Sequence, residues 1–125
     1  RINLTDSKDQ IINKIKKAKT DPMPMPNGLQ ELDERPEAKN LLGIYASLTN
    51  TTLEKSIENF SGKNFSVFKE SLSEILVNKI EPISIEIKKL LADQKYLDQI
   101  LLEGVEKANL IASKKIQKIK EIVGF

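Results

Sequence analysis

The stretch from Asp93 to Phe125 constrains the fold most, because its apolar residues recur at helical spacing over almost its whole length. At about 100° of rotation per residue, seven of them share one side of a helix: Leu97, Leu101, Ala108, Ile111, Ala112, Ile119 and Ile122. Gly104, Ala108 and Ala112 are small and lie on that side, so a neighbouring helix can approach closely there. We predict a long amphipathic helix, capped by Asp93, that packs along this line against a second long helix.

Charge is distributed unevenly along the chain. The net charge of +2 combines two basic ends with an acidic middle, since residues 8–19 carry +4, residues 105–125 carry +3 and residues 21–103 carry −5. On the last predicted helix, three lysines project along one flank and a fourth lies on the apolar side itself. They are Lys107, Lys114 and Lys118 on the flank, and Lys115 on the apolar side. The last helix is therefore predicted to have an apolar face with a basic edge.

Composition favours one all-α domain and excludes several kinds of chemistry. The 125 residues are 39% hydrophobic and can bury one core, while five Pro and five Gly are few for a β-sandwich with its many turns. Cys and His are absent. Their absence excludes disulfides, zinc sites of the Cys/His type, nucleophilic cysteine chemistry and histidine acid–base catalysis.

Targeting signals are also missing from the sequence. There is no run of about 18 apolar residues and no leader of charged then apolar residues, so we expect neither a membrane span nor a signal peptide. A cysteine-free chain of this kind is expected to be cytoplasmic. Because it opens at Arg1 rather than Met, we expect it to be a piece of a longer protein.

The first predicted helix begins after Thr5 or Asp6, either of which can cap it, and runs to about Lys19. Ile11 and Ile15 lie on its apolar face. Its lysines suit the negative end of the helix dipole, so a solvated surface is one interpretation of the cluster. A phosphate-facing role is the other, and the sequence leaves both open.

Residues 21–35 contain the run PMPMPNG, whose prolines remove backbone donors and exclude a continuous helix. The segment is predicted to be a proline-rich loop. Asn27 and Gly28 can form the tight turn of a small hairpin within it. A structural connector is favoured here over an extended ligand for a partner groove.

Two helices are predicted next. Pro36 suits the first turn of a helix that ends near Asn50. Thr51 and Glu54 can form a capping box for a short third helix, with a left-handed stop at Gly62.

The second long helix covers the Ser66–Leu91 segment, capped by Asn64 or by Ser66 itself. Its apolar residues keep a spacing of three or four, which predicts a core-facing side. Pro82 lies inside the pattern and is predicted to kink or break the helix after Lys79 or Ile80, because its ring clashes with the preceding turn.

These elements predict an all-α fold, a helical bundle with two long packed helices plus a proline-rich loop or small hairpin near residues 21–35. No Gly-rich phosphate loop and no metal-ligand pattern occurs. Carboxylates such as Glu70 and Glu74 fit solvated helix charges better than an acid–base pair. Two classes of function remain: an RNA-facing module, and a helical bundle whose partner is another protein or its own missing domain.

Six strings, in order, carry a resemblance to a known family: DQIINKIKKAKTD, PEAKNLLGIYASL, GKNFSVFKESL, IEPI, LLEGVEKANLIASKKI and IVGF. Together they resemble the C-terminal region of bacterial and mitochondrial-type tryptophanyl-tRNA synthetases, which are class I aminoacyl-tRNA synthetases. The resemblance covers nearly the whole chain. The matching residues are Lys14, Ala18, Thr20, Asp21, Asn40, Leu41, Leu42, Tyr45, Gly62, Phe65, Phe68, Lys69, Pro82, Glu103, Gly104, Lys107, Ala108, Ala112 and Gly124. Departures occur at the long proline-rich loop Pro22–Pro36 and at Phe125.

The resemblance implies a place in a larger enzyme. In that family the segment follows the KMSKS loop of a Rossmann catalytic domain and forms the helical domain that receives the tRNA anticodon. Residues 1–20 would then link from the missing catalytic domain, residues 21–35 would be a connector loop, and residues 36–125 would be the helical anticodon-binding domain.

The implied parent is a tryptophan–tRNA ligase that uses ATP, with Mg, to attach tryptophan to tRNA(Trp), working as a homodimer. Its implied partners are tRNA(Trp) and its own N-terminal catalytic domain. The piece itself is expected to hold no cofactor and to lack the active site, and alone it is expected to be monomeric. The alternative is a helical protein–protein interaction domain or structural appendage without RNA contact.

Catalytic, cofactor and metal residues are therefore not expected in this chain. Contacts with tRNA are expected from the lysines of its basic ends: Lys14, Lys17, Lys107, Lys114, Lys115 and Lys118. Splayed anticodon bases are read by stacking and by edge hydrogen bonds. Tyr45, Phe65 and Tyr96 are candidate stacking platforms, although core packing is favoured for each aromatic ring. Asn109 and Gln117 are candidate edge readers.

Overall fold

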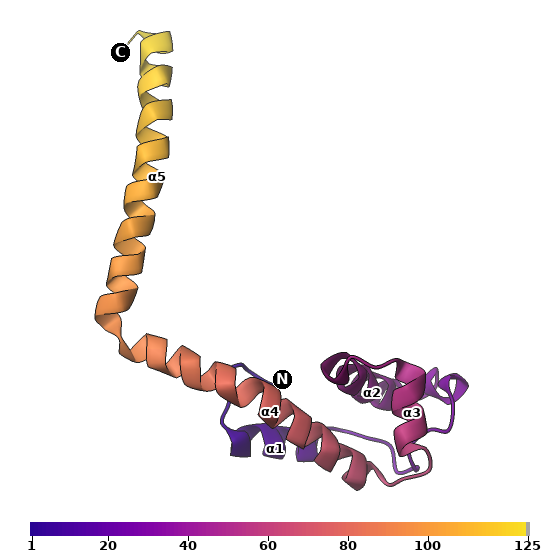
Figure 1. Ribbon diagram of the computed structural model, residues 1–125. Helices are drawn as coiled ribbons and strands as arrows, with labels where there is room; N and C mark the ends of the chain where they lie inside the picture. Colours follow the sequence, from indigo (N-terminus) through magenta and orange to yellow (C-terminus); the bar gives the residue numbers. More distant parts are fainter. Residues whose placement is uncertain (125) are drawn as a thin grey trace. The chain divides into compact units, whose positions relative to one another are not determined.

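The computed structural model describes residues 1–124, and every regular element in that range is a helix (Figure 1). The elements are α1 (Lys8–Lys17), the 3-10 helix η1 (Leu29–Leu32), α2 (Pro36–Thr49), α3 (Leu53–Phe60), α4 (Phe65–Ala92) and α5 (Gln94–Val123). The all-α class is confirmed, as are the two long helices, α4 and α5. Phe125, which the predicted last helix and the resemblance both include, lies outside the described residues.

The chain divides into two compact units, Arg1–Ile85 and the residues from Glu86 onward. We call them the first and the second unit. The first contains α1, η1, α2, α3 and most of α4, and the second contains the last turns of α4 and all of α5. The division predicted at residues 20 and 35 concerns the parent protein and stays a prediction. Over residues 1–124, no helix is long and apolar enough to cross a membrane.

Helix α1 begins one or two residues later than predicted because Ser7, rather than Asp6 or Thr5, caps it. The Ser7 hydroxyl accepts a hydrogen bond from the Gln10 backbone N–H, and the Gln10 side chain accepts one from the Ser7 N–H. This reciprocal pair is a capping box and satisfies two of the free donors at the helix start. Asp6 is left free to bind elsewhere, and the helix ends at Lys17 rather than near Lys19.

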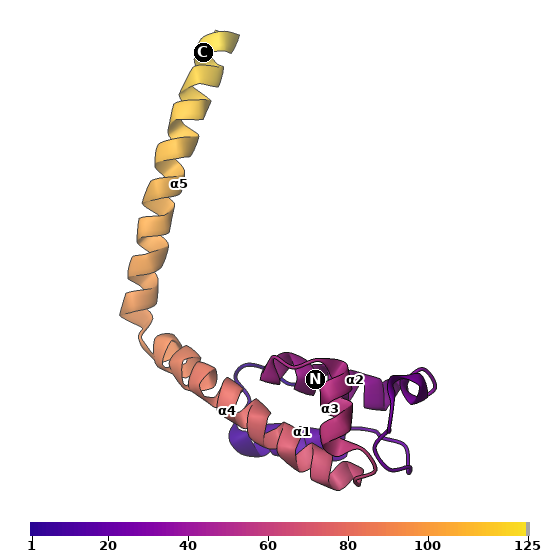
Figure 2. The same cartoon turned by 45° about the vertical axis from the view of Figure 1, so that its right-hand side comes forward.

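The core of the first unit draws on all of its helices and on the proline-rich loop. α2 packs against α3, and α1 lies alongside α4 (Figure 2). Phe68 is completely buried, with the rings of Tyr45 and Phe60 at centroid distances of 5.9 Å and 5.0 Å. The most deeply buried aliphatic side chains are Ile11, Met25, Leu32, Leu42 and Leu72. Their spread over the elements makes this one continuous hydrophobic core.

The proline-rich loop is an integral part of that core. Met25 is 1% exposed, and its backbone pairs with the connection between α3 and α4, at Lys63 O (2.8 Å) and Gly62 N (3.2 Å). Arg35 holds the start of the loop by donating to both Asp21 carboxylate oxygens (2.8 and 3.0 Å) and to Pro24 O (2.7 Å). The buried Met25 agrees with the structural-connector interpretation, and the loop pairs with another loop instead of forming a hairpin.

The ends of α2 and α3 lie where the sequence predicts them, except that the cap of α3 is one residue later. Asn50 adopts a left-handed conformation after α2, and Gly62 does so after α3. The predicted cap at Thr51 is wrong by one residue, because the Thr52 hydroxyl accepts from the Lys55 N–H. The Thr51 hydroxyl instead bonds to those of Thr49 and Ser56. Thr51 and Thr52 are equally suitable caps by residue type. Because the Thr51 hydroxyl is bonded to Thr49 and Ser56, Thr52 caps the helix.

Helix α4 runs unbroken through Pro82 to Ala92, so of the two predicted effects of Pro82 the break after Lys79 or Ile80 is wrong, and the kink stays a prediction. Proline removes one backbone donor, and helical residues on both sides retain theirs. Buried residues occur along the part of α4 that belongs to the first unit, from Phe65 to Ser84. The helix therefore has enough packing to offset the cost of a single interior proline.

Helix α5 is confirmed over 30 residues, with the predicted cap at Asp93, whose carboxylate accepts from the Tyr96 N–H at 3.1 Å. Gly124 ends it in a left-handed conformation. None of its residues is buried, and a side-chain carbon placed on Gly104 would meet nothing within 4 Å. The predicted packing of Gly104, Ala108 and Ala112 against the Ser66–Leu91 segment stays a prediction.

Candidate nucleic-acid interface

Lys14, the first of the predicted RNA contacts, takes part in an ion pair within the first unit. Its Nζ lies 2.6 Å from Asp6 Oδ2, and the same oxygen accepts from the Asn3 N–H at 2.7 Å. The Asp6 side chain is only 6% exposed. The Lys14 hydrogen bond, followed by the one from Asn3, lowers the pKa of Asp6 against the opposing effect of burial. Lys14 thus fixes the segment before α1, and its charge is partly neutralised.

Lys17 lies in the exposed last turn of α1, next to Lys16. Lys69 of α4 reaches the same helix end, where its Nζ donates to Ala18 O at 2.7 Å and to Lys16 O at 3.4 Å. A cation at this point satisfies terminal carbonyls and matches the negative end of the helix dipole. Lys69 therefore reaches the end of α1 whose last turn carries Lys16 and Lys17.

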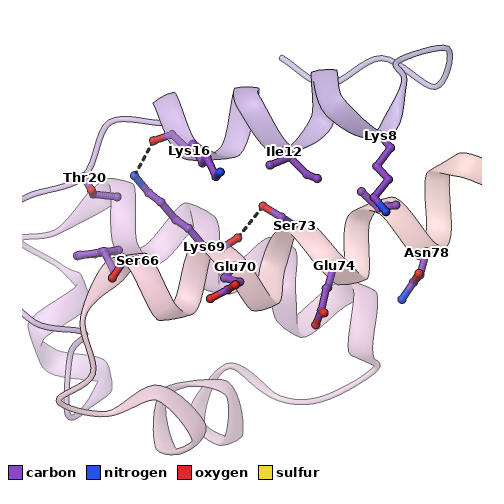
Figure 3. A pocket seen from close by; sticks show the side chains of 12 residues that line it. Lys8, Ile12, Lys16, Thr20, Ser66, Lys69, Glu70, Ser73, Glu74 and Asn78 are labelled. Atoms are coloured by element: carbon purple, nitrogen blue, oxygen red, sulfur yellow. Dashed lines mark hydrogen bonds between the residues drawn. The ribbon is translucent and has the colours of Figure 1, made fainter.

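A groove of about 990 Å³ follows the junction of α1 and α4 inside the first unit (Figure 3). α1 contributes Lys8, Ile12 and Lys16, and α4 contributes two carboxylates, Glu70 and Glu74. The remaining lining residues are Thr20, Phe65, Ser66, Lys69, Ser73, Val77 and Asn78. The α1 side of the groove carries lysines, and the α4 side carries both the two carboxylates and Lys69.

One end of this groove is better suited to an anion than the rest. Lys16, Lys69, Thr20 and Ser66 lie together there, as Figure 3 shows. Lysine ammonium and hydroxyl groups are common donors to phosphate oxygens. Lys8 and Lys69 are not among the residues that the sequence predicts to contact tRNA, and Lys16 belongs only to the first-helix lysine cluster, for which the sequence leaves a phosphate-facing role open. Lys69 was among the residues that carry the resemblance, and that was the available signal.

The other four predicted lysines lie on α5, in the second unit, and all are exposed. At about 100° per residue, Lys107, Lys114 and Lys118 share an arc of roughly 40°, and Lys115 lies well outside it on the apolar face. The flank predicted from the sequence is therefore present. Because the two basic ends belong to different units, their convergence on one surface stays a prediction.

The aromatic candidates divide between the two units. Tyr45 packs edge-on against Phe60 at a centroid distance of 5.0 Å, and Phe65 is 9% exposed beneath the Arg35 guanidinium. Both rings belong to the core, in agreement with the favoured interpretation. Tyr96 on α5 is 47% exposed. Among the five candidate base readers, Tyr96, Asn109 and Gln117 are accessible.

The carboxyl groups with a lowered pKa do not line the groove between α1 and α4. In the part of the chain that the structure describes, no group of three or more potential ligand residues could hold a metal ion. The lowered pKa values belong to the carboxyl groups of Asp6, Asp21 and Glu54. Those of Asp6 and Asp21 follow from structural hydrogen bonds to Lys14 and Arg35.

The chain matches bacterial tryptophan–tRNA ligases along all of its 125 residues. It is 46% identical to that of Agrobacterium fabrum, 45% identical to that of Rickettsia felis and 42% identical to that of Mesorhizobium japonicum. The matched part is the C-terminal part of those proteins, and the chain spans only 35–37% of their length. No family model matches the chain. The resemblance identified from the sequence strings is confirmed.

Proposed function

We propose that this chain is the helical anticodon-binding region of a tryptophan–tRNA ligase. It would hold the anticodon end of tRNA(Trp) while the catalytic domain of the longer protein attaches tryptophan, with ATP and Mg as that domain's requirements. The observation that carries the proposal is the match to tryptophan–tRNA ligases over the whole chain. An all-helical fold with exposed lysines agrees with a binding role.

Two basic surfaces would contribute the phosphate contacts. On α5, Lys107, Lys114 and Lys118 form a flank along which a nucleic-acid backbone can lie. On the first unit, Lys16 and Lys69 line the groove where α1 meets α4, and Lys17 follows Lys16 in the exposed last turn of α1. The acidic residues Glu70 and Glu74 border the rest of the groove, so a phosphate is expected only at its basic end.

The test is the salt dependence of binding to a tRNA(Trp) anticodon stem-loop. Changing Lys114 and Lys118 to Gln should weaken binding of the 125-residue chain and flatten its salt slope by about one to two units, since each lost single-stranded phosphate contact removes roughly 0.7. Stability should change little, because exposed charges contribute little to folding. The measurement is a fluorescence anisotropy titration at several salt concentrations.

The matched control is Lys55→Gln with Lys88→Gln, which removes the same charge from exposed lysines of α3 and α4. It should leave the slope unchanged. Equal losses in both double variants would mean that net charge, rather than the α5 flank, drives binding.

The alternative is a structural or protein-binding appendage, and the exposed leucines and isoleucines of α5 favour it. It predicts no stem-loop binding even at low salt. It also predicts that Lys114→Gln with Lys118→Gln has no effect on aminoacylation by the full-length enzyme.

A further inference from the structure

Asn27 is the one asparagine of the chain that is followed by glycine. It lies exposed at the end of the proline-rich loop, between the buried Met25 and the start of η1. The side-chain amide of an asparagine can be attacked by the backbone nitrogen of the next residue. Glycine permits the closest approach because it has no Cβ. Sequence and exposure therefore make Asn27 the asparagine most open to this reaction.

The hydrogen bonds around Asn27 leave the two reacting groups free. The Asn27 backbone N–H donates to Glu31 Oε1 at 3.3 Å. Within residues 1–124, neither the Gly28 N–H nor the side-chain NH2 group of Asn27 donates a hydrogen bond to another residue. Gly28 is extended, with φ −160° and ψ 167°. Its nitrogen can therefore lose its proton to hydroxide from the solvent and act as a nucleophile.

Ser61 adds a polar contact that the Asn–Gly pair alone does not provide. Its hydroxyl donates to Asn27 Oδ1 at 2.5 Å, although the two residues are 34 positions apart in sequence. The backbone hydrogen bonds of Met25 with Gly62 and Lys63 bring these two segments together. A donor at this oxygen stabilises the negative charge that develops there when the amide carbon is attacked. The fold thus places an oxyanion donor beside Asn27.

We propose that Asn27 is a site of spontaneous deamidation, with the Gly28 nitrogen as nucleophile and the Ser61 hydroxyl as donor to the developing oxyanion. The deprotonated Gly28 nitrogen forms a bond to Asn27 Cγ. The Cγ–Nδ2 bond then breaks, and the nitrogen takes a proton from water and leaves as ammonia, so that a succinimide ring is closed. Water then adds to either ring carbonyl and opens the ring. Opening at one carbonyl gives aspartate, and opening at the other gives isoaspartate.

Either product adds a carboxylate to an acidic part of the surface. Asn27 lines a groove of about 520 Å³ together with Glu31, Glu54 and Glu58. Like charges at short range repel one another. Isoaspartate also lengthens the backbone by one carbon atom between Met25 and η1. Deamidation therefore loosens the contact between the proline-rich loop and the connection that follows α3.

The first experiment follows Asn27 during prolonged incubation of the chain at neutral pH. Peptide mapping by mass spectrometry should show aspartate and isoaspartate at Asn27 before either appears at another asparagine. Gly28→Ala should slow the reaction roughly tenfold, which corresponds to about 1.4 kcal/mol of activation free energy, because a Cβ hinders the approach of the nitrogen. A Cβ placed on Gly28 meets nothing within 4 Å, so the fold should be retained, as circular dichroism would check.

Two results of this experiment would overturn the proposal. One is an Asn27 side chain that stays intact or reacts no sooner than the other asparagines. The other is an equal rate of deamidation in the unaltered and Gly28→Ala chains.

The second experiment tests the role of Ser61. Ser61→Ala should slow deamidation of the folded chain about two- to tenfold, the effect expected for the loss of one hydrogen bond. The matched control is Ser47→Ala, which removes an exposed hydroxyl that donates to Gly43 O within α2 and should leave the rate unchanged. In concentrated urea, Ser61 and Asn27 no longer meet, so Ser61→Ala should have no effect there. Faster deamidation of folded Ser61→Ala would mean that Ser61 restrains Asn27, and would contradict its proposed role.

The third experiment tests the effect on the loop. Asn27→Asp imitates one product, and it should speed hydrogen exchange of the Met25 amide, which donates to Lys63 O at 2.8 Å. Asn13→Asp adds the same charge at an exposed position of α1 and should leave this exchange unchanged. Equal exchange at Met25 in both variants would contradict the proposed loosening.

Discussion

The two units of the molecule differ in whether their apolar residues are buried. In the first unit, Ile11, Met25 and Phe68 come from a helix, a loop and a second helix, and each is at most 1% exposed. In the second, α5 has an equally regular apolar pattern and no buried residue. The pattern alone therefore shows which side of a helix will be covered, and the covering partner has to be found elsewhere.

The two units also differ in how far apart in sequence their hydrogen-bonded polar side chains lie. In the first unit, Arg35 and Lys69 hydrogen-bond carbonyls and carboxylates distant in sequence, and so fix the loop and the end of α1. On α5, the side-chain hydrogen bonds join residues one turn apart, such as Gln99 and Glu103. Long-range polar contacts hold the first unit in one arrangement, while α5 keeps its lysines available for ligands.

The largest expected difference between the units concerns truncation of one large apolar side chain. Phe68→Ala should lower the free energy of unfolding of the first unit by roughly 3–5 kcal/mol, because it leaves a cavity among closely packed rings. Leu101→Ala on α5 removes a side chain that is 66% exposed and should change the free energy of unfolding by less than about 0.5 kcal/mol. Denaturant unfolding, followed by tyrosine fluorescence and circular dichroism, measures both.

The outcome at Leu101 also tests the predicted packing of α5. A loss of several kcal/mol for Leu101→Ala would show that α5 packs within its own chain.

A smaller effect is expected where Arg35 holds the loop. Arg35→Gln should cost about 1.5–3 kcal/mol, because Asp21 and the Pro24 carbonyl lose a charged donor. Lys39→Gln breaks an ion pair with Asp33 in which both side chains are more than half exposed, and it should cost less than about 1 kcal/mol. Equal costs would mean that the buried position of Arg35 adds nothing.

The same Arg35 contact makes stability depend on pH with a definite sign. Hydrogen bonds from Arg35, and then from the Met23 N–H, lower the pKa of Asp21 below its usual value of 3.8. At a pH between the folded and the unfolded pKa of Asp21, the unfolded chain binds more protons than the folded chain. The stabilisation by the Asp21–Arg35 contact is therefore complete above about pH 5 and is lost as the pH falls through the folded pKa. Asp21→Asn should remove this part of the acid sensitivity, as urea unfolding at pH 3 and pH 6 would show.

Much of the fold could be predicted from residues whose local chemistry has one solution. Asn50 and Gly62 end helices in left-handed conformations, and Asp93 caps α5, as their types indicate. The start of α1 could not be predicted, because Thr5, Asp6 and Ser7 are all good caps. Only the Ser7–Gln10 pair and the contact of Asp6 with Lys14 decide among them.

The candidate site also has a part that could be predicted from the sequence and a part that could not. The lysines of α5 could be identified because charge and helical spacing are local properties of the sequence. The groove between α1 and α4 could not, because Lys16 and Lys69 are far apart in sequence and meet only after the core has formed. The partial neutralisation of Lys14 also depends on a folded contact. The spacing of residues in the sequence can therefore indicate a binding surface on a single helix. A surface formed by two helices depends on how they pack.

The smallest expected effect has opposite signs in the two units and concerns two glycines. Gly62 has φ +68°, where a Cβ is strained, so Gly62→Ala should destabilise the first unit by about 1 kcal/mol. Gly104 lies inside α5 with open space around its missing Cβ, so Gly104→Ala should favour the helix by roughly 0.5–1 kcal/mol. Hydrogen exchange of the α5 amides reports the second change, and denaturant unfolding reports the first. If Gly104→Ala were instead to weaken α5, another helix must approach the Gly104 backbone more closely than a methyl group permits.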